Sequence, residues 1–488
     1  MTEKEIKKIK TLGQLKKAGW KSITIKDEIR KNLKANLSAG INSFEGIIGF
    51  EDTVIPDIER AILSKHNILL LGLRGQAKTR IARMMTTLLD EYIPYVEGSE
   101  INDDPFAPIS RDAIELLREQ GDDTPIAWLH RDDRFVEKLA TPDVSVADLI
   151  GDVDPIKAAN LKLPYSDQRV IHFGLVPRAH RSIFVINELP DLQPRIQVSL
   201  FNILQEGDLQ IRGFKLRLPL DVQFIFTANP EDYTNRGSIV TPLKDRIESQ
   251  ILTHYPKDIA TAREITGQEA KLNDDQSDIF IPDLVYDLLE SISFKARESE
   301  FIDEKSGVSA RLSISALENL VSTAERRSLI NKDKKTCIRL TDFWGIIPAM
   351  TGKVELVYEG EQEGPYSVAL HLLGQAMKDL FLSVFPHPEE ANGRKDPYGT
   401  VKAFFSGGNS IDLENDDSDK AYLKSLKTVA GLEKLVTNMK VPKEEIPFYM
   451  ELVLHGLSEF EYINKTIVDT QVHYEDPLAN MFDDLSEN

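Results

Sequence analysis

Short runs of Ile, Val, Leu and Phe alternate with longer amphipathic stretches over most of the first half of the chain. Such alternation is typical of βα units, whose parallel strands are buried on both faces and whose helices cross over between them. Five strands connected in this way predict a three-layer αβα core with a mainly parallel sheet. We expect these strands at residues 66–71, 135–140, 182–187, 222–228 and 249–254.

Beyond Pro256 the strand signals fade and helical periodicity takes over. This change predicts an all-α lid, followed by a mostly helical extension whose acidic tail, from Tyr474, is expected to fray. The lid helices are expected at 258–266, 282–298, 313–330 and 341–350. The predicted domains are an N-terminal helical segment (1–40), an αβα core (41–256), a lid (257–359) and a C-terminal extension of unknown role (360–488).

Charge and cysteine content narrow the class of protein. The formal net charge is -20, and such a surface repels nucleic-acid phosphates, so we expect no nucleic-acid partner. Basic residues do gather between residues 4 and 34, but at helical spacing, which is typical of a solvated helix face. Cys337 is the single cysteine, and no secretion signal or bilayer-length apolar run is present. A cytoplasmic protein without membrane insertion is expected.

A glycine-containing loop follows the first predicted strand and precedes an amphipathic stretch, the context that a phosphate-binding loop requires. Backbone N–H groups at the helix start can cradle the β-phosphate, Lys78 can reach the β- and γ-phosphates, and Thr79 can ligate Mg²⁺. Ala77 replaces the usual glycine before the lysine, and its Cβ crowds the loop if φ is positive. The alternative is an ordinary strand-to-helix turn. The loop residues are Gly72, Leu73, Arg74, Gly75, Gln76, Ala77, Lys78 and Thr79.

A second buried strand, at 182–187, ends in Asn187-Glu188, where P-loop ATPases place an aspartate and a catalytic glutamate. Asn187 would therefore hold Mg²⁺ only through a metal-bound water, and more weakly than a carboxylate would. Glu188 could orient the attacking water at the γ-phosphate. The alternative for Glu188 is a residue that merely starts a helix.

Three further polar residues lie at positions suited to ATP hydrolysis. Asn229 ends the strand at 222–228 and could hydrogen-bond the attacking water or the γ-phosphate. Arg246 precedes the last strand and is the candidate arginine finger for a neighbouring subunit. Arg311 starts a lid helix and could couple the lid to the nucleotide. Either arginine could instead be an ordinary surface salt-bridge partner.

Together these motifs resemble those of the AAA+ superfamily, over a region that runs from residue 47 to Arg311. Ile48 and Gly49 stand where AAA+ proteins pack the adenine. The segment 141–151 resembles the helix-2 insertion of the MoxR and magnesium-chelatase I-subunit branch. Segments 174–180 and 207–220, the second a hairpin signal, are similar to the same branch, and the stretch 96–133 resembles an insertion of chelatase I subunits.

This resemblance implies an ATPase that uses ATP and Mg²⁺ and assembles as a homo-oligomer, a hexameric ring. It also implies a partner with a von Willebrand factor A domain and a client protein that ATP turnover remodels, matures or loads with metal. Three alternatives stay open: the ATPase subunit of a magnesium or cobalt chelatase, a nucleotide-dependent scaffold in which Ala77 and Asn187 slow hydrolysis, and a DNA-engaged AAA+ regulator. The acidic balance disfavours the last.

Overall fold

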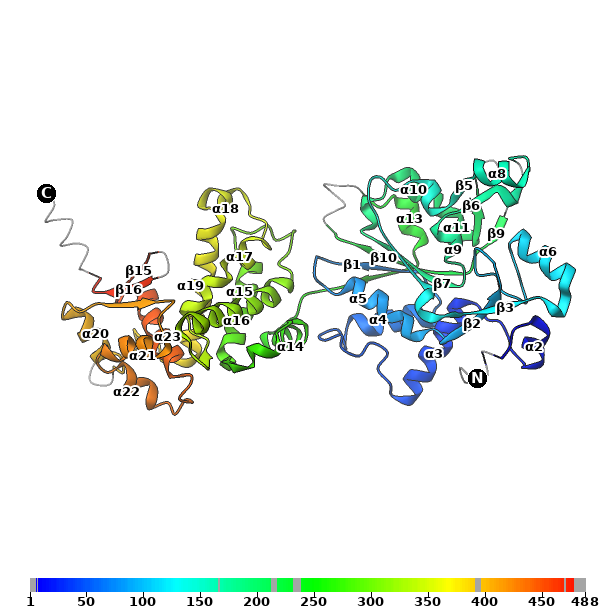
Figure 1. Ribbon diagram of the computed structural model, residues 1–488. Coiled ribbons are helices and arrows are strands. Elements are labelled where there is room, and N and C mark those ends of the chain that lie inside the picture. Colours follow the sequence, from blue (N-terminus) through cyan, green and yellow to red (C-terminus); the bar gives the residue numbers. More distant parts are fainter. Residues whose placement is uncertain are drawn as a thin grey trace. The chain divides into compact units, whose positions relative to one another are not determined.

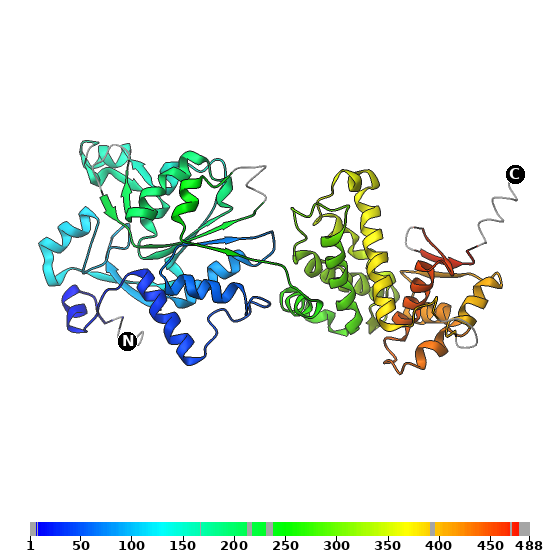
Figure 2. The same ribbon diagram turned by 180° about the vertical axis from the view of Figure 1, so that it is seen from behind.

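The computed structural model describes residues 6, 8–165, 167–211, 217–230, 238–390, 396–468 and 471–477. The chain divides into two compact units, unit 1 (Met1–His254) and unit 2 (Tyr255–Asn488). Figures 1 and 2 show the elements of each unit from opposite sides. Among the described residues, no helix has both the length and the apolar character needed to cross a bilayer.

The described part of unit 1 is built on a five-stranded sheet in the order β11-β1-β10-β7-β4. Each neighbouring pair of strands is parallel. All five strands lie where the hydrophobic pattern predicts them, and their carboxyl ends share one edge of the sheet. Their bounds are β1 Ile68–Leu71, β4 Phe135–Leu139, β7 Ser182–Asn187, β10 Val222–Ala228 and β11 Ser249–Leu252.

Helices cover both faces of this sheet (Figure 1), because successive strand residues point to opposite sides. Ile183 and Val185 pack into one core, with residues of α3, α4 and α5. Phe184 and Ile186 pack into a second core on the other face, with residues of α9, α10, α11 and α13. The expected three-layer αβα arrangement is therefore confirmed. The helices are α3 Ile25–Ala39, α4 Val54–Leu63, α5 Lys78–Met84, α9 Leu175–Arg178, α10 Pro194–Ser199, α11 Phe201–Glu206 and α13 Thr241–Arg246.

The remaining elements of unit 1 belong to the N-terminal segment and to the stretches between core strands. Antiparallel pairs form between β2 and β3, between β5 and β6, and between β8 and β9. The last pair is the predicted hairpin, whose residues 212–216 lie outside the described part of the chain. These elements are α2 Leu12–Lys17, β2 Tyr92–Val96, α6 Arg111–Gln120, β3 Ile126–His130, α7 Val146–Leu149, β5 Gly151–Val153, α8 Pro155–Leu161, β6 Ile171–Phe173, β8 Asp208–Gln210 and β9 Arg217–Pro219.

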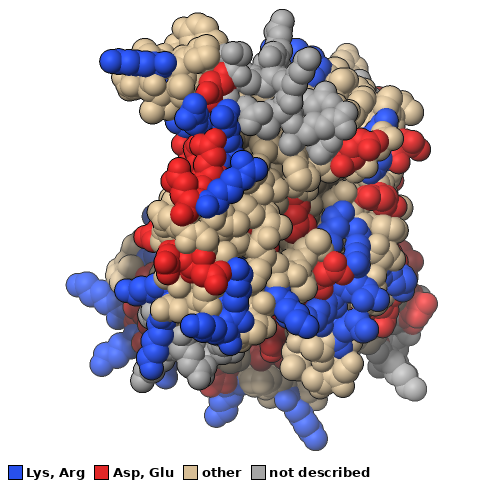
Figure 3. All heavy atoms as spheres, turned by 90° about the vertical axis from the view of Figure 1, so that its right-hand side faces the viewer, with Lys and Arg blue, Asp and Glu red and all other residues tan. Residues whose placement is uncertain are grey.

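Most described lysines of the basic N-terminal stretch are exposed: Lys8, Lys10, Lys16, Lys17, Lys21, Lys31 and Lys34. Figure 3 shows one face of the molecule on which Lys and Arg side chains gather with Asp and Glu side chains among them. Lys16, at the end of α2, pairs with Asp122 at 2.6 Å, and Lys31 on α3 pairs with Asp90 at 3.1 Å. Exposed pairs of this kind contribute little free energy, which agrees with a solvated helix face.

Unit 2 is mainly helical and has one continuous hydrophobic core. That core runs from Val285 through Leu320 and Phe381 to Leu454 and Tyr474, so the predicted lid and the predicted extension pack together. The helices are α14 Ile259–Glu269, α15 Asp283–Glu298, α16 Arg311–Asn331, α17 Ile347–Thr351, α18 Tyr358–Glu363, α19 Pro365–Val384, α20 Gly399–Ser406, α21 Asp419–Thr428, α22 Leu432–Thr437 and α23 Ile446–Glu459.

The C-terminal part of unit 2 also contains strands that the sequence pattern does not predict. β16 lies between β14 and β15 and is antiparallel to both. Tyr474 on β16 is fully buried, so the expectation that the tail frays from this residue is wrong for residues 474 and 475, because they belong to a strand whose Tyr474 side chain packs into the core. Residues 478–488 lie outside the described part of the chain. The strands of unit 2 are β12 Ile279–Phe280, β13 Thr336–Cys337, β14 Ile411–Glu414, β15 Asn464–Val468 and β16 Gln471–Glu475.

Candidate nucleotide site

Three adjacent strands bring the sequence-predicted residues of unit 1 to one edge of the sheet. β1 leads into the loop 72–79, β10 leads into Asn229, and β7 ends at Asn187 and leads into Glu188. The register pairs Leu71 with Ala228 and Phe226 with Ile186, so the three strands end at nearly the same level. Ligands of open parallel sheets bind at the carboxyl edge, which makes this edge the candidate site.

The loop after β1 is held tightly against the end of β11. Thr253 Oγ1 donates a hydrogen bond to Gln76 Oε1 at 2.6 Å, and both residues are buried. A Cβ on Gly72 would lie 2.0 Å from Thr253 Oγ1 and 2.2 Å from Gln76 Oε1. A side chain at position 72 would therefore displace the Thr253–Gln76 hydrogen bond, so glycine permits this close packing of the loop.

The turn into α5 uses left-handed backbone at two positions. Gly75 has φ +74°, a conformation that glycine adopts at no steric cost. Ala77, the N-cap of α5, has φ +54° and ψ +11°, so the Cβ of this alanine does stand where glycine is favoured. The residue that departs from the usual loop sequence therefore carries backbone strain.

Lys78 opens α5 directly behind this turn and is buried, with 8% of its surface exposed. Its Nζ donates to the carbonyl oxygens of Gly72 and Leu73, the second at 2.8 Å. The side chain thus folds back onto the loop, and its positive charge lies beside the turn that leads into α5. This arrangement fits a phosphate group.

Asn187, at the end of β7, is buried and is hydrogen-bonded at both ends of its amide. Its Nδ2 donates to Glu137 Oε1 at 2.6 Å, and its Oδ1 accepts from Thr227 Oγ1 at 3.1 Å. Glu188 follows with φ +53° and ψ +52°, and its N–H donates to Thr227 Oγ1 at 3.2 Å. Asn229, after β10, is also buried.

The remaining predicted residues are placed differently. Gly49 has φ +83° and donates its N–H to Glu51 Oε1 at 3.1 Å, while Ile48 is half-buried. Arg246 is engaged within its own unit: its Nε donates to Gln205 Oε1 at 3.0 Å, and its guanidinium lies 4.9 Å from the ring centre of Phe201. Its role toward a neighbouring subunit stays a prediction.

Arg311 is exposed at the first turn of α16 and belongs to unit 2. Its backbone N–H donates to Ser309 Oγ at 3.1 Å. The structure therefore confirms that Arg311 starts a helix of the lid region, and its reach toward the phosphates stays a prediction.

The structure adds Arg83, Glu137 and Thr227 to the site. Glu137 on β4 accepts from Arg83 Nε at 2.8 Å and from Arg83 NH2 at 3.1 Å, in addition to the amide of Asn187. A carboxylate inside a mainly apolar predicted strand was the available signal, but its partners depend on the strand order. Sequence spacing alone does not give that order.

Mg²⁺ would find few protein ligands at this edge. Among the described residues, no three His, Cys, Asp or Glu side chains lie close enough together to hold a metal ion. The predicted metal residues, Thr79 and Asn187, offer a hydroxyl and an amide. This donor set fits Mg²⁺ that is held mainly by phosphate oxygens and water, as is common for this ion.

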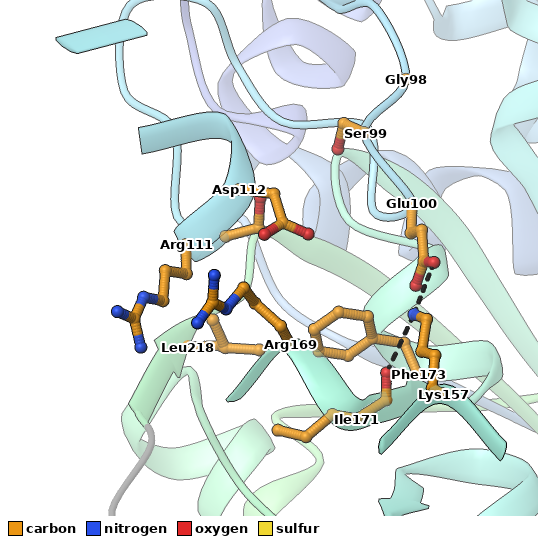
Figure 4. A pocket seen from close by; sticks show the side chains of 11 residues that line it. Gly98, Ser99, Glu100, Arg111, Asp112, Lys157, Arg169, Ile171, Phe173 and Leu218 are labelled. Carbon is orange, nitrogen blue, oxygen red and sulfur yellow. Dashed lines mark hydrogen bonds and ion pairs between the residues drawn. The ribbon is translucent and has the colours of Figure 1, made fainter. Parts of the chain in front are cut away.

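A separate cavity of about 100 Å³ lies in unit 1, among the stretches between core strands (Figure 4). Its charged lining is mostly paired: Lys157 Nζ lies 2.7 Å from Glu100 Oε1, and Arg169 NH2 lies 2.8 Å from Asp167 Oδ2. Arg111, also on its wall, pairs with Glu115. Its described lining includes no residue of the loop 72–79, so this cavity is distinct from the candidate nucleotide site.

The sheet order, with a phosphate-type loop between β1 and α5 and polar residues after β7 and β10, defines an α/β fold of the AAA+ type. Within this class, residues 126–247 match the family described as AAA domain (dynein-related subfamily). The matched segment begins with β3 and ends beside Arg246, so it contains Asn187, Glu188 and Asn229. An AAA domain implies an ATPase that binds nucleotide.

Several solved structures are distantly similar. NtrX from Brucella abortus in complex with ADP shares 16% identity, with 60% of this chain and 53% of that chain covered and a TM-score of 0.34, so the chain spans about half of NtrX. A structure of the complex between subunits BchI and BchD of magnesium chelatase shares 17% identity, with 66% of this chain and 98% of that chain covered and a TM-score of 0.34. A RuvB mutant from Thermotoga maritima shares 10% identity, with 91% of this chain and 97% of that chain covered and a TM-score of 0.35.

Proposed function

We propose that this chain is a MoxR-like AAA+ ATPase that hydrolyses ATP with Mg²⁺ in an oligomeric ring. The observation that carries the proposal is the meeting of Lys78, Asn229 and Glu188 at the ends of three adjacent strands. A cation at the start of a helix, a buried amide and a carboxylate are the groups that γ-phosphate and an attacking water require.

Each residue has a separate task in this proposal. The N–H groups of the loop and Lys78 bind the β- and γ-phosphates, and Thr79 holds Mg²⁺. Glu188 orients the attacking water and Asn229 contacts the same water or the γ-phosphate. Ile48 and Gly49 pack the adenine. Arg246 completes a neighbour's site, and Arg311 couples unit 2 to the nucleotide.

Ring assembly gives this ATPase a way to act on another protein. We propose that it remodels, matures or loads with metal a client protein, together with a partner that has a von Willebrand factor A domain. Support comes from the stretches 141–151 and 207–220, which resemble the insertions of the MoxR branch; α7 lies in the first stretch, and β8 and β9 lie in the second. The chelatase subunit is the alternative that the same insertions allow.

A nucleotide-dependent scaffold is the second candidate, and the φ of +54° at Ala77 favours it. A strained turn can hold the loop in a form that binds ATP but hydrolyses it slowly. Hydrolysis measured under saturating ATP and Mg²⁺ separates the two: a turnover on the order of 1 per second agrees with typical enzymes. A rate that Glu188→Gln does not reduce would favour the scaffold.

Replacement of Lys78 by alanine tests the site itself. Lys78→Ala should abolish ATP binding, because the buried ammonium supplies a charge-assisted contact to phosphate from the start of α5, whereas Arg74, the other cation of the loop, is exposed. Titration with a fluorescent ATP analogue measures the effect. Lys34→Ala, an exposed lysine on α3, is the control and should bind like the parent. Equal binding by Lys78→Ala would show that the loop is not the nucleotide site.

A further inference from the structure

Asn187 has only one amide orientation that its partners allow. A carboxylate accepts hydrogen bonds and cannot donate one when ionised. The amide nitrogen of Asn187 must therefore face Glu137, at 2.6 Å, and the amide oxygen must face the hydroxyl of Thr227, at 3.1 Å. Glu137, Asn187 and Thr227 thus form a fixed line across the neighbouring strands β4, β7 and β10.

The far end of this line holds the backbone of Glu188. Thr227, with 1% of its surface exposed, accepts the N–H of Glu188 at 3.2 Å while its own proton goes to Asn187. Glu188 has φ +53°, a conformation that L-residues rarely adopt without support from their surroundings. The Thr227 hydroxyl is therefore placed to keep Glu188 in this turn.

The near end of the line reaches the helix that follows the phosphate loop. Arg83 on α5 lies at 2.8 Å and 3.1 Å from the two oxygens of Glu137. The Glu137 side chain is 24% exposed and that of Arg83 is 63% exposed. Contacts therefore run from α5, which begins with Lys78, through Glu137, Asn187 and Thr227 to the turn at Glu188.

We propose that Glu137 is a positioning residue for ATP hydrolysis and that it is the reason why position 187 is an asparagine. This inference rests on the proposed ATPase function. Unlike an ionised carboxylate, an amide donates to Glu137 and accepts from Thr227 at once, so an aspartate at position 187 would place two carboxyl groups at hydrogen-bond distance, where their repulsion is relieved only if one of them takes up a proton. The negative charge of this corner lies on β4 and not on β7, and Asn187 acts through Thr227 on Glu188.

Exchange of the two charges tests this idea. Asn187→Asp alone should lower kcat about tenfold while ATP binding changes by less than about threefold, because the repelled carboxylate releases Thr227 and the Glu188 turn but leaves the loop intact. The double variant Glu137→Gln/Asn187→Asp restores one amide and one carboxylate in exchanged places. Its kcat should return to within about threefold of the parent.

A matched double variant shows whether the location of the charge matters. Glu119 is exposed at the end of α6, so Glu119→Gln/Asn187→Asp removes the same charge without touching Glu137. It should stay as slow as Asn187→Asp alone. Two results would overturn the proposal: Asn187→Asp alone raises kcat or lowers the Mg²⁺ concentration for half-maximal activity, or the exchanged pair is no faster than the single variant.

Thermal unfolding separates this inference from the proposed function. If the parent neither binds nor hydrolyses ATP, the proposed function fails, and the charge pairing is still tested by stability. Asn187→Asp should then lower the melting temperature of unit 1, and the exchanged pair should restore it. Normal ATP turnover in the parent, with no recovery of either kcat or melting temperature in the exchanged pair, would refute the role of Glu137 alone.

Discussion

Ala77 adopts a left-handed backbone conformation that favours glycine. Its φ of +54° is accompanied by a buried neighbour on each side, Gln76 and Lys78, so the loop cannot relax into another turn without disturbing packed residues. Non-glycine residues in this region cost on the order of 1 kcal/mol. The strain falls on the residue that departs from the usual loop sequence.

Ala77→Gly should therefore stabilise the folded loop. The gain is the relieved strain minus the larger conformational entropy of glycine in the unfolded chain, which leaves roughly 0.5 kcal/mol and a rise of about 1 to 2 °C in the melting temperature of unit 1. Differential scanning calorimetry measures it. Gly267→Ala in α14 of unit 2, a helical glycine with open space around its Cβ position, is the control and should leave the unit 1 transition unchanged. A lower melting temperature for Ala77→Gly would contradict the assigned strain.

At the scale of elements, a partly buried polar contact links the residues that precede β7 and β10. His180 Nδ1 accepts the N–H of Asp221 at 3.0 Å, and Asp221 Oδ2 accepts the N–H of Ile25 at the start of α3, at 2.8 Å. Burial lowers the pKa of His180 to about 4, and burial raises the pKa of Asp221 to about 6. The two pKa values are therefore shifted in opposite directions across the same pH range.

The sign of each contribution follows from the proton count. His180 is neutral in the folded state, so its share of stability is present above its unfolded pKa of about 6.5 and is lost as pH falls toward 4. Asp221 takes up a proton in the folded state before the unfolded state does, so unit 1 gains stability from it as pH falls through 6 toward 3.8. In the parent the two effects partly cancel.

In Asp221→Asn, the loss of stability that His180 causes at low pH should no longer be offset. Because the amide oxygen can still accept from Ile25, the contact survives while the opposing titration disappears. Between pH 6 and pH 4 the free energy of unfolding of unit 1 should fall roughly 2 to 3 kcal/mol more steeply than in the parent. Urea unfolding at pH steps checks this, with Asp132→Asn, an exposed aspartate, as control. An identical pH slope in parent and Asp221→Asn would contradict the prediction.

Sequence pattern predicts the central elements well, because their burial leaves a strong signal. The strands at 182–187 and 222–228 have the bounds that their mainly apolar sequences indicate. β15 and β16 were missed because Lys465, Thr466, Gln471 and His473 make the segment read as polar, although alternate residues such as Tyr474 are buried. Strands of a small sheet that bury only one face leave only this weak alternation of polar and apolar residues in the sequence.

The candidate site likewise contains residues that the sequence predicts and residues that it does not. Residues that end a strand or directly follow one, such as Asn187, Glu188 and Asn229, could be placed from the sequence, because parallel strands end at a common edge. Thr227 and Glu137 could not, since each lies inside a strand and gains its role only when β10, β7 and β4 are neighbours. Strand order is a property of the whole sheet, and chain spacing does not determine it.

At the scale of the whole molecule, the proposed ring requires Arg246 to act outside its own subunit. In the folded chain its guanidinium contacts Gln205 and Phe201 on α11. Cation–π and amide contacts at a partly exposed site are weak, on the order of 1 kcal/mol. A neighbouring γ-phosphate could therefore compete for this side chain when rings form.

Mixing two inactive variants tests this arrangement. Arg246→Ala keeps its own Lys78 and Glu188, and Glu188→Gln keeps Arg246, so a mixed interface contains one complete site although neither parent ring does. ATP turnover should reappear in the mixture, because a trans arginine stabilises transition-state charge. The control is a mixture of Glu188→Gln with Lys78→Ala/Arg246→Ala, which completes no site. Mixed rings that form and stay inactive would assign Arg246 to its contacts on α11.

The place of β16 in its sheet has a consequence for how the protein is made. This strand lies between β14 and β15, and its Val472 and Tyr474 enter the core that also holds the helices of unit 2. During translation β16 is synthesised after all of those helices, whereas unit 1 can fold while unit 2 is still being synthesised. Until residue 475 has left the exit tunnel, the nascent unit 2 presents an unfinished apolar face, which is the surface that chaperones bind.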